Sequence, residues 1–212
     1  MLVLASASPR RRELLTQAGF TFEVRPAHIP EEPRVGEDPI AYVVRLAREK
    51  AEAVYAEAMR SATAPRGHPP STTLRSAQDD SPSLGAQDDN LVVLGADTTV
   101  VLDGLILGKP EDAADAARML RLLSGRTHRV ITGVALVTAK RTEVAAEVTA
   151  VKFLTLSDEE IAAYVATGEP MDKAGAYAIQ GRAAKWIPRI EGDYFNVVGL
   201  PIALVSTLLE GL

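Results

Sequence analysis

Apolar residues follow two different periods along this chain, and the period of each segment predicts its structure. Short apolar runs, alternating patterns and segments rich in valine and threonine predict extended segments at 2–4, 20–24, 91–102, 105–107, roughly 128–138 and roughly 143–153. The pair Asp103-Gly104 between two of these runs predicts a tight hairpin. The extended segments therefore cover much of the chain and include one pair joined by a short turn.

Helices are predicted where apolar positions recur every three or four residues between capping signals. Ser8 is a natural N-cap and Pro9 suits the first helical position, before a helix that Gly19 closes. Asp38-Pro39 opens a long helix with apolar positions from Ile40 to Ala58. Three more helices are expected. The apolar face of the first carries Ala113, Ala117, Leu120 and Leu123. A capping box at 157–160 opens the second, and Pro201 precedes the third.

This alternation of strands and helices predicts an α/β protein of mixed α+β type, a single domain over 1–212. Because a tight hairpin lies in the middle of the chain, we expect a twisted mixed sheet with flanking helices. Residues 61–90 differ from the rest: prolines, serines and a repeated Ala-Gln-Asp-Asp predict a flexible insertion without chemistry.

Composition narrows the classes of function. The chain has no cysteine, which excludes disulfides and thiolate metal sites, and its three histidines are too far apart for a zinc hydrolase. A net charge of −5 argues against nucleic acid as a partner. No apolar stretch approaches membrane-spanning length, so we expect no membrane partner and a cytoplasmic location.

The first candidate site is the run Ser6-Ala-Ser8-Pro-Arg10-Arg11. A strand that ends where a helix begins offers backbone N–H groups and a positive dipole end, and the arginines add bidentate donors, which together favour a phosphate. An exposed basic helix start is the alternative interpretation.

The second candidate is Asp97, a carboxylate that interrupts an apolar strand. An ionised group there needs a partner, which favours function over a strand-end turn cap. Lys109, between Gly108 and Pro110, follows shortly after. Lys50 lies on or beside the apolar stripe of the long helix, either snorkelling to solvent or projecting into a polar cleft.

Two later segments are rich in small residues. The segment 168–181 carries Asp172, Lys173 and Gln180 among glycines and alanines, which is typical either of a ligand-binding loop or of a tightly packed one. The segment 192–201 predicts a second packed loop before the last helix.

Six motifs occur in order along the chain: Ser6-Ala-Ser8-Pro-Arg10-Arg, Gly95-Ala-Asp97-Thr98, Gly108-Lys109-Pro110, Leu123-Ser-Gly125, Asp172-Lys-Ala-Gly-Ala-Tyr-Ala-Ile-Gln180-Gly181 and Asn196-Val-Val-Gly-Leu-Pro201. Together they resemble the Maf family of nucleoside triphosphate pyrophosphatases. The resemblance implies a fold related to inosine triphosphate pyrophosphatases, with a site between two lobes, usually in a homodimer. It also implies cleavage of a nucleoside triphosphate, here dTTP or UTP, with Mg²⁺ or Mn²⁺ as the divalent metal cofactor.

The same resemblance implies roles for individual residues. The catalytic carboxylate falls on Asp97, and the substrate-selecting positions fall on Arg10, Thr98 and Gln180. Phosphate-binding positions match Ser8, Arg11, Lys50 and Lys109, and metal contacts match Glu31 and Asp97. The sequence departs from the family pattern at Pro30 before Glu31, at 182–184 and at 193–196.

Two questions stay open at this point. Asp97 would either deprotonate the attacking water or hold the metal that activates it, and the sequence does not separate these roles. The alternative function is a nucleotide-sensing regulator of septum formation and cell division, in which the site only recognises its ligand.

Overall fold

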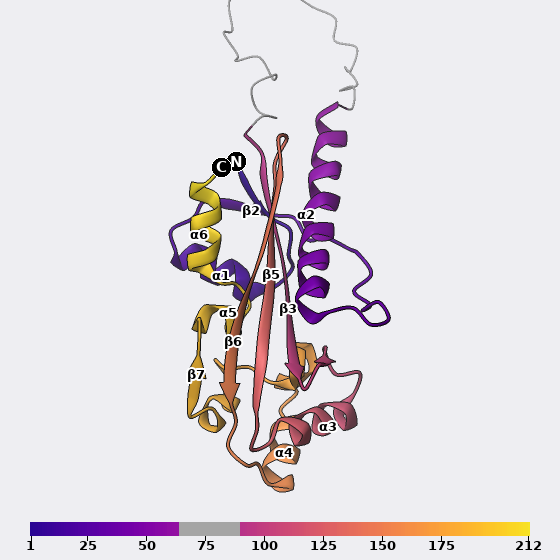
Figure 1. The fold of residues 1–212 in the computed structure, drawn as a ribbon, viewed down its shortest axis with the longest axis vertical. Helices are drawn as coiled ribbons and strands as arrows, with labels where there is room; N and C mark the ends of the chain where they lie inside the picture. Colours follow the sequence, from indigo (N-terminus) through magenta and orange to yellow (C-terminus); the bar gives the residue numbers. More distant parts are fainter. Residues whose placement is uncertain (64–89) are drawn as a thin grey trace, which may run out of the picture.

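The computed structural model describes residues 1–63 and 90–212 as a mixed α/β fold built on one sheet (Figure 1). Its strands are β1 Leu2–Leu4, β2 Phe22–Val24, β3 Val92–Leu102, β4 Leu105–Leu107, β5 Thr127–Val137, β6 Thr142–Lys152 and β7 Arg189–Glu191. Its helices are α1 Pro9–Gln17, α2 Pro39–Thr63, α3 Ala113–Leu123, α4 Asp158–Val165, α5 Tyr194–Val198 and α6 Ile202–Glu210. Short 3₁₀ turns lie between α4 and β7, namely η2 Glu169–Asp172, η3 Ala174–Ala176 and η4 Arg182–Trp186.

The sheet is mixed, as the sequence predicts. Its order is β2-β1-β3-β5-β6-β7, with β4 paired to the far end of β3. The pairs of β1 with β2 and β3 are parallel, and the other pairs are antiparallel. Long strands β3, β5 and β6 therefore run through both halves of the molecule and join them.

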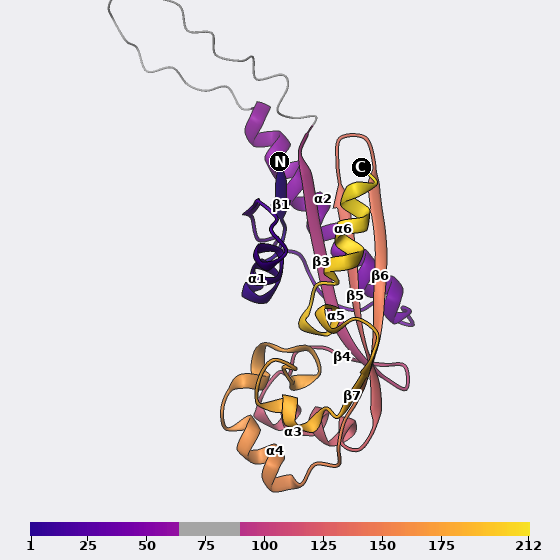
Figure 2. The same ribbon diagram turned by 90° about the vertical axis from the view of Figure 1, so that its left-hand side faces the viewer.

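Two lobes are formed around these long strands. In one lobe, α2 packs on one face of the sheet, and α1 and α6 pack on the other (Figures 1 and 2). In the second lobe, α3, α4 and the 3₁₀ turns pack around Phe153 and Trp186. Figure 2 shows this second lobe at the end of the sheet away from both chain termini.

Local signals explain several element boundaries. Ser8 caps α1, and Asp38 accepts hydrogen bonds from the first turn of α2. Asp103 and Gly104 both have positive φ, 51° and 84°, as a tight hairpin of this kind requires. The capping box that opens α4 is also present, with Ser157 and Glu160 exchanging hydrogen bonds.

Three local predictions are wrong or only partly right. Ile40, at the start of α2, is 39% exposed, whereas Tyr42 and Val43 just after it are buried against the sheet. Ala113 is exposed in the same way, and Ala116 and Met119 are buried on α3 instead. The segment 192–201 is not only a loop, since it contains the short helix α5.

The predicted flexible insertion over 61–90 lies almost entirely outside the described residues, which exclude 64–89. No helix among the described residues is long and apolar enough to cross a membrane.

Candidate active site between the lobes

Strand β3 has an open edge in its middle, and the candidate site lies there. Strand β1 pairs with β3 only at Val92–Leu94, and β4 pairs with it only at Val100–Leu102. The intervening residues of β3, which include Asp97, have no strand beside them on that edge within the described chain. Helix α1 begins just beyond the carboxyl end of β1, which is where open α/β sheets commonly bind ligands.

Asp97 is buried in the middle of β3, with 7% of its surface exposed. Its Oδ1 accepts a hydrogen bond of 2.7 Å from Nζ of Lys50, which is also 7% exposed and comes from α2. The strand continues to Leu102, so Asp97 is not a strand-end turn cap. Lys50 likewise does not snorkel to solvent, because its ammonium group faces the sheet.

Two glycines let α2 approach the sheet closely enough for this ion pair. Gly95 lies two residues before Asp97 on the same face, and Gly133 lies directly opposite Asp97 on β5. A Cβ atom on Gly95 would lie 2.0 Å from the carbonyl oxygen of Ala47, and one on Gly133 would lie 2.4 Å from that of Val43. Both positions therefore require glycine for the observed packing of α2.

Glu31 completes a cluster of three charges. Its Oε1 lies 2.5 Å from Nζ of Lys50, so one ammonium group contacts two carboxylates. The Glu31 side chain is 46% exposed, whereas that of Asp97 is 10% exposed. The hydroxyl of Tyr42 donates a 2.8 Å hydrogen bond to the Glu31 carbonyl and fixes the loop that follows Pro30. The cluster is thus closed at Asp97 and open to solvent at Glu31.

The environment shifts the pKa values of the two carboxylates, Asp97 and Glu31, in opposite directions. Burial raises the pKa of Asp97 above its ordinary value, against the opposing charges of Lys50 and Arg11. Burial also acts to raise the pKa of Glu31, but the hydrogen bond and charge of Lys50, with the charges of Lys109 and Arg11, bring it below its ordinary value. Relative to free carboxylic acids, the environment thus favours the protonated form of Asp97 and the ionised form of Glu31.

Ser8 and Arg11 form the α1 side of the site. Ser8 is the N-cap, and its hydroxyl accepts from the Arg11 amide. The Arg11 guanidinium donates to the carbonyls of Gly199 and Ala96, at 2.8 and 2.9 Å, and to the hydroxyls of Ser6 and Thr98, both at 3.0 Å. Since a guanidinium has five N–H donors, one remains beyond these contacts within the described residues.

Arg11 therefore does a structural task that the sequence did not reveal. It satisfies the Ala96 carbonyl at the open edge of β3 and ties α1 to the loop between α5 and α6. Burial lowers the pKa of Arg11, and the charges of Asp97 and Glu31 oppose that shift. Its predicted phosphate contact stays a prediction.

Thr98 follows Asp97 but faces the other side of the sheet, as neighbours in a strand do. On that face Ala96 packs in the core with α1 and α6, and Val100 packs in the core with α3 and α4. Thr98 lies between them, at the junction of the two lobes. Its Oγ1 is 2.9 Å from that of Thr132 and accepts from Arg11.

Arg10 lies across from the second lobe. Burial lowers the pKa of Arg10, while Asp172, Glu13 and Tyr164 act electrostatically to raise it. Its Nε is buried without a hydrogen-bond partner in the part of the chain that the structure describes. An unpaired buried donor of this kind favours a ligand contact, because leaving it unsatisfied is costly.

Lys109 and Gln180 are exposed, and neither side chain has a hydrogen-bond partner within residues 1–63 and 90–212. The charge of Lys109 nevertheless acts on Glu31. The carbonyl of Gly108 accepts a 3.0 Å hydrogen bond from Gly175, which joins the Lys109 turn to the segment that leads to Gln180. The structure thus clusters Asp97, Lys50 and Glu31, and it places no direct contact between them and Gln180.

Asn196 is a buried polar residue whose structural role was missed. Its Nδ2 donates to the carbonyl of Val130 at 3.1 Å and to Thr149 Oγ1 at 2.9 Å, and its carbonyl accepts from Thr132 at 3.1 Å. These bonds hold α5 on the sheet beside Thr98. An asparagine within an otherwise apolar run was the available signal.

The described residues contain no group of three or more His, Cys, Asp or Glu side chains that could hold a metal ion. Two carboxylates, Glu31 and Asp97, do converge on one cation, the ammonium of Lys50. Hard cations such as Mg²⁺ commonly use one or two carboxylates together with substrate phosphates. This donor set therefore fits a metal that binds with its substrate.

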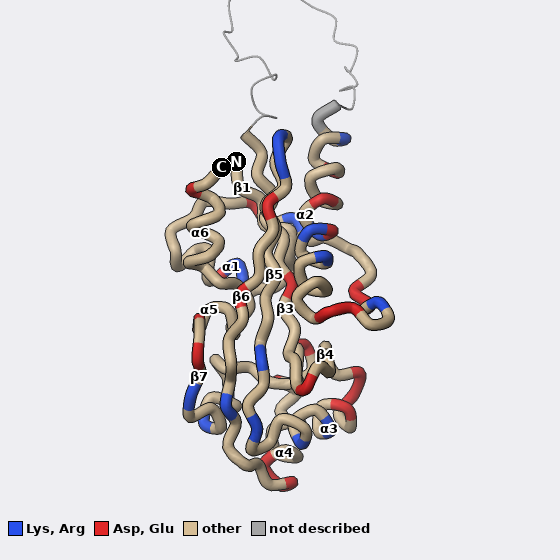
Figure 3. Tube along the Cα trace, in the orientation of Figure 1, with Lys and Arg blue, Asp and Glu red and all other residues tan. Residues whose placement is uncertain are grey.

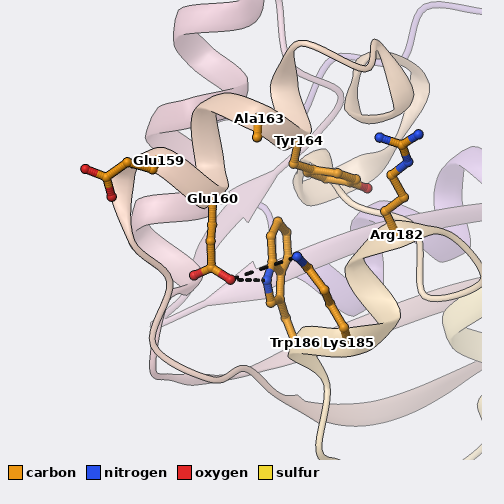
Figure 4. Close-up of a pocket in the computed structure, with 7 residues that line it drawn as sticks. All are labelled: Glu159, Glu160, Ala163, Tyr164, Arg182, Lys185 and Trp186. Atoms are coloured by element: carbon orange, nitrogen blue, oxygen red, sulfur yellow. Dashed lines mark hydrogen bonds and ion pairs between the residues drawn. The ribbon is translucent and has the colours of Figure 1, made fainter.

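A separate pocket of about 290 Å³ lies in the second lobe (Figure 4). Its lining residues include Glu160, Tyr164, Lys185 and Trp186. None of the predicted site residues lines it, so it is distinct from the Asp97 cluster.

The fold and the site define an α/β protein with a buried carboxylate–lysine pair beside a helix N-terminus. The family described as "Maf-like protein" matches residues 1–212, and the chain belongs to this family. A dTTP/UTP pyrophosphatase from Koribacter versatilis is 51% identical over 209 residues, which cover 99% of this chain and 93% of that protein. Proteins of the same name from Salmonella typhimurium and Moorella thermoacetica are each 50% identical, covering 99% and 98% of this chain and 91% and 93% of their own lengths.

Proposed function

We propose that this protein is a nucleoside triphosphate pyrophosphatase that converts dTTP and UTP to the monophosphate and pyrophosphate. The observation that carries the proposal is the buried Asp97–Lys50 pair at the open edge of β3, beside the start of α1. The relatives named dTTP/UTP pyrophosphatase support the substrate class. A site that only recognised phosphates would gain nothing from a buried carboxylate next to them.

The triphosphate binds through several kinds of donor. The backbone amides at the start of α1, where Ser8 is the cap, offer N–H groups and the positive end of the helix dipole. Lys50, Lys109 and the unpaired Nε of Arg10 supply positive charge. These groups neutralise the substrate and the charge that develops on the pyrophosphate leaving group.

Asp97 acts as the proton acceptor. Its Oδ1 is held by Lys50, whereas its Oδ2 has no hydrogen bond within the described residues and is free to accept one from water. The raised pKa of Asp97 suits this role. The water oxygen forms a bond to the α-phosphorus as its proton passes to Asp97, and the bond from the α-phosphorus to the bridging oxygen breaks to release pyrophosphate.

Glu31 and Asp97 are the residues that would hold Mg²⁺ or Mn²⁺. Such an ion, when bound, supplies charge neutralisation on the phosphates and lowers the pKa of a bound water. Lys50 orients both carboxylates, with or without the metal, because its ammonium group contacts each of them.

Product analysis tests the proposal. Wild-type protein with Mg²⁺ should release dTMP from dTTP, and inorganic phosphate should appear only after inorganic pyrophosphatase is added. Removal of the metal with EDTA should stop the reaction, and excess Mg²⁺ should restore it. Release of inorganic phosphate without the added enzyme would mean cleavage of the terminal phosphate and would refute the proposal.

Three further points belong to this proposal. We place the protein in the cytoplasm, and we expect it to act as a homodimer, as the family implies. We expect no nucleic-acid partner, since the net charge is −5 and basic and acidic segments occur together in both lobes (Figure 3). Sedimentation and a DNA-binding assay at low salt test these expectations.

A further inference from the structure

The turn that carries Gln180 is short and closed. The amide of Gly181 donates to the carbonyl of Ala178 at 3.0 Å, so Gln180 lies within a single tight turn. The Gln180 side chain is exposed and makes no hydrogen bond among the described residues. Its position is therefore determined by the backbone on either side of it.

Two side chains from outside the turn hold that backbone. The amide of Ala178 donates to the Tyr164 hydroxyl at 3.2 Å, and the amide of Arg182 donates to Oε1 of Glu169 at 3.1 Å. The Tyr164 hydroxyl in turn donates to the same Oε1 at 2.9 Å. One Tyr164–Glu169 pair thus fixes the backbone two residues before and two residues after Gln180.

The shape of the turn is matched to the Glu169 carboxylate. A Cβ atom on Gly181 would lie 1.8 Å from Glu169 Oε1, so the carboxylate packs directly against this glycine. The φ of Gly181 is −102°, which other residues adopt readily. Glycine is needed here because of the neighbouring carboxylate and not because of the backbone conformation.

Tyr164 is firmly anchored on α4. It is 3% exposed, and its ring packs edge-on against Trp186 with centroids 5.0 Å apart. Figure 4 shows its hydroxyl pointing toward the side of the pocket where Arg182 lies.

We propose that Tyr164 and Glu169 are positioning residues for pyrimidine selection, which they set by fixing the turn of Gln180. The inference rests on the proposed function, because it assumes that Gln180 reads the base. A glutamine amide offers a donor and an acceptor together, so a small rotation or shift of the turn removes the match to a uracil or thymine edge. Misplacement of a positioning group by about 1 Å is enough to cost up to about a hundredfold in rate.

The test compares Glu169→Ala with the conservative Glu169→Gln and with a matched control, Glu160→Ala. In the conservative variant the side-chain amide oxygen would still accept both hydrogen bonds, whereas alanine would accept neither. Glu160 lies on α4, the helix that carries Tyr164, and it binds Ser157 and Trp186 but does not contact the Gln180 turn. The control therefore removes a hydrogen-bonded carboxylate from the same lobe and leaves the contacts of the Gln180 turn in place.

The first readout is the ratio of kcat/KM for dTTP to that for CTP. We expect Glu169→Ala and Tyr164→Phe to lower this ratio by about tenfold or more, and Glu169→Gln and Glu160→Ala to keep it within about twofold of wild type. Gly181→Ala, which displaces the carboxylate without removing it, should behave like Glu169→Ala. The inference would be overturned if Glu169→Ala kept the wild-type ratio, or if Glu169→Gln lowered the ratio as much as Glu169→Ala does.

The second readout does not depend on activity. Hydrogen exchange in the ligand-free protein should show the amides of Ala178 and Arg182 protected in wild type and in Glu169→Gln. Protection should be lost for Arg182 in Glu169→Ala and for Ala178 in Tyr164→Phe. Unchanged protection would also overturn the inference. Absence of hydrolysis by the wild type would instead remove the proposed function, so the two failures are distinguishable.

Discussion

Lys50→Met is the change that most directly probes the charged cluster. The side chains of Lys50 and Asp97 are 9% and 10% exposed, so their ion pair is effectively buried. Methionine keeps the length and the apolar stem of the lysine but leaves the Asp97 carboxylate without its cation. Glu31 is affected less, because its side chain is 46% exposed and can regain water.

Breaking a buried pair by removing one partner costs about 3–5 kcal/mol, because the remaining charge is left uncompensated. We therefore expect Lys50→Met to lower the free energy of unfolding by about 3 kcal/mol or more at neutral pH. The double variant Lys50→Met/Asp97→Asn removes that uncompensated charge and should recover much of the loss. The coupling energy between the two positions should be about 2 kcal/mol.

Urea unfolding of the wild type, both single variants and the double variant gives the four free energies of unfolding of this double-mutant cycle, and from them the coupling energy. The penalty of Lys50→Met should also depend on pH. Without the lysine, burial raises the pKa of Asp97 further, so the folded state binds a proton more tightly than the unfolded state. The penalty is then full above the folded pKa and shrinks as the pH falls through it. A coupling energy below about 0.5 kcal/mol, or a penalty independent of pH, would refute this reasoning.

Three other predictions follow from single sites. Burial lowers the pKa of His128 to about 4, so between about pH 6.5 and about pH 4 the unfolded histidine is protonated and the folded one is not. The free energy of unfolding of the wild type should therefore fall by roughly 3 kcal/mol as the pH falls through this range. Urea unfolding of His128→Phe should not show this fall. Gly133→Ala should destabilise the folded protein by about 2–3 kcal/mol, because the added Cβ would meet a backbone oxygen of α2 that cannot move aside. An unchanged Tm in thermal unfolding would contradict the close packing. Gln180→Glu should lower kcat/KM for dTTP and UTP by about tenfold to a hundredfold, because a carboxylate has no donor for a pyrimidine carbonyl; unaltered kinetics would show that Gln180 does not read the base.

The elements were largely predictable because their signals are local. Ser8-Pro9 starts α1, Asp103-Gly104 forms the hairpin and Ser157 opens α4, each through contacts within a few residues. The errors at Ile40 and Ala113 have one cause. Apolar periodicity shows which side of a helix is apolar, but not where along its length the helix meets the sheet.

The candidate site was predictable as a set of residues and not as an arrangement. Asp97 was visible because a carboxylate within an apolar strand needs a partner, but that partner, Lys50, lies 47 positions away. Arg11 bonds to Ala96 and Gly199, which are 85 and 188 positions away, and nothing near it in sequence indicates this. Such contacts depend on the strand order, which local patterns do not specify.

Hydrolysis of dTTP in oxygen-18-labelled water tests the central claim most directly. If water attacks the α-phosphorus with Asp97 as the proton acceptor, the label must appear in dTMP and not in pyrophosphate. The same measurement on Asp97→Asn should show little product of either kind, because an amide cannot accept the proton. Label in pyrophosphate, or in released inorganic phosphate, would contradict the account.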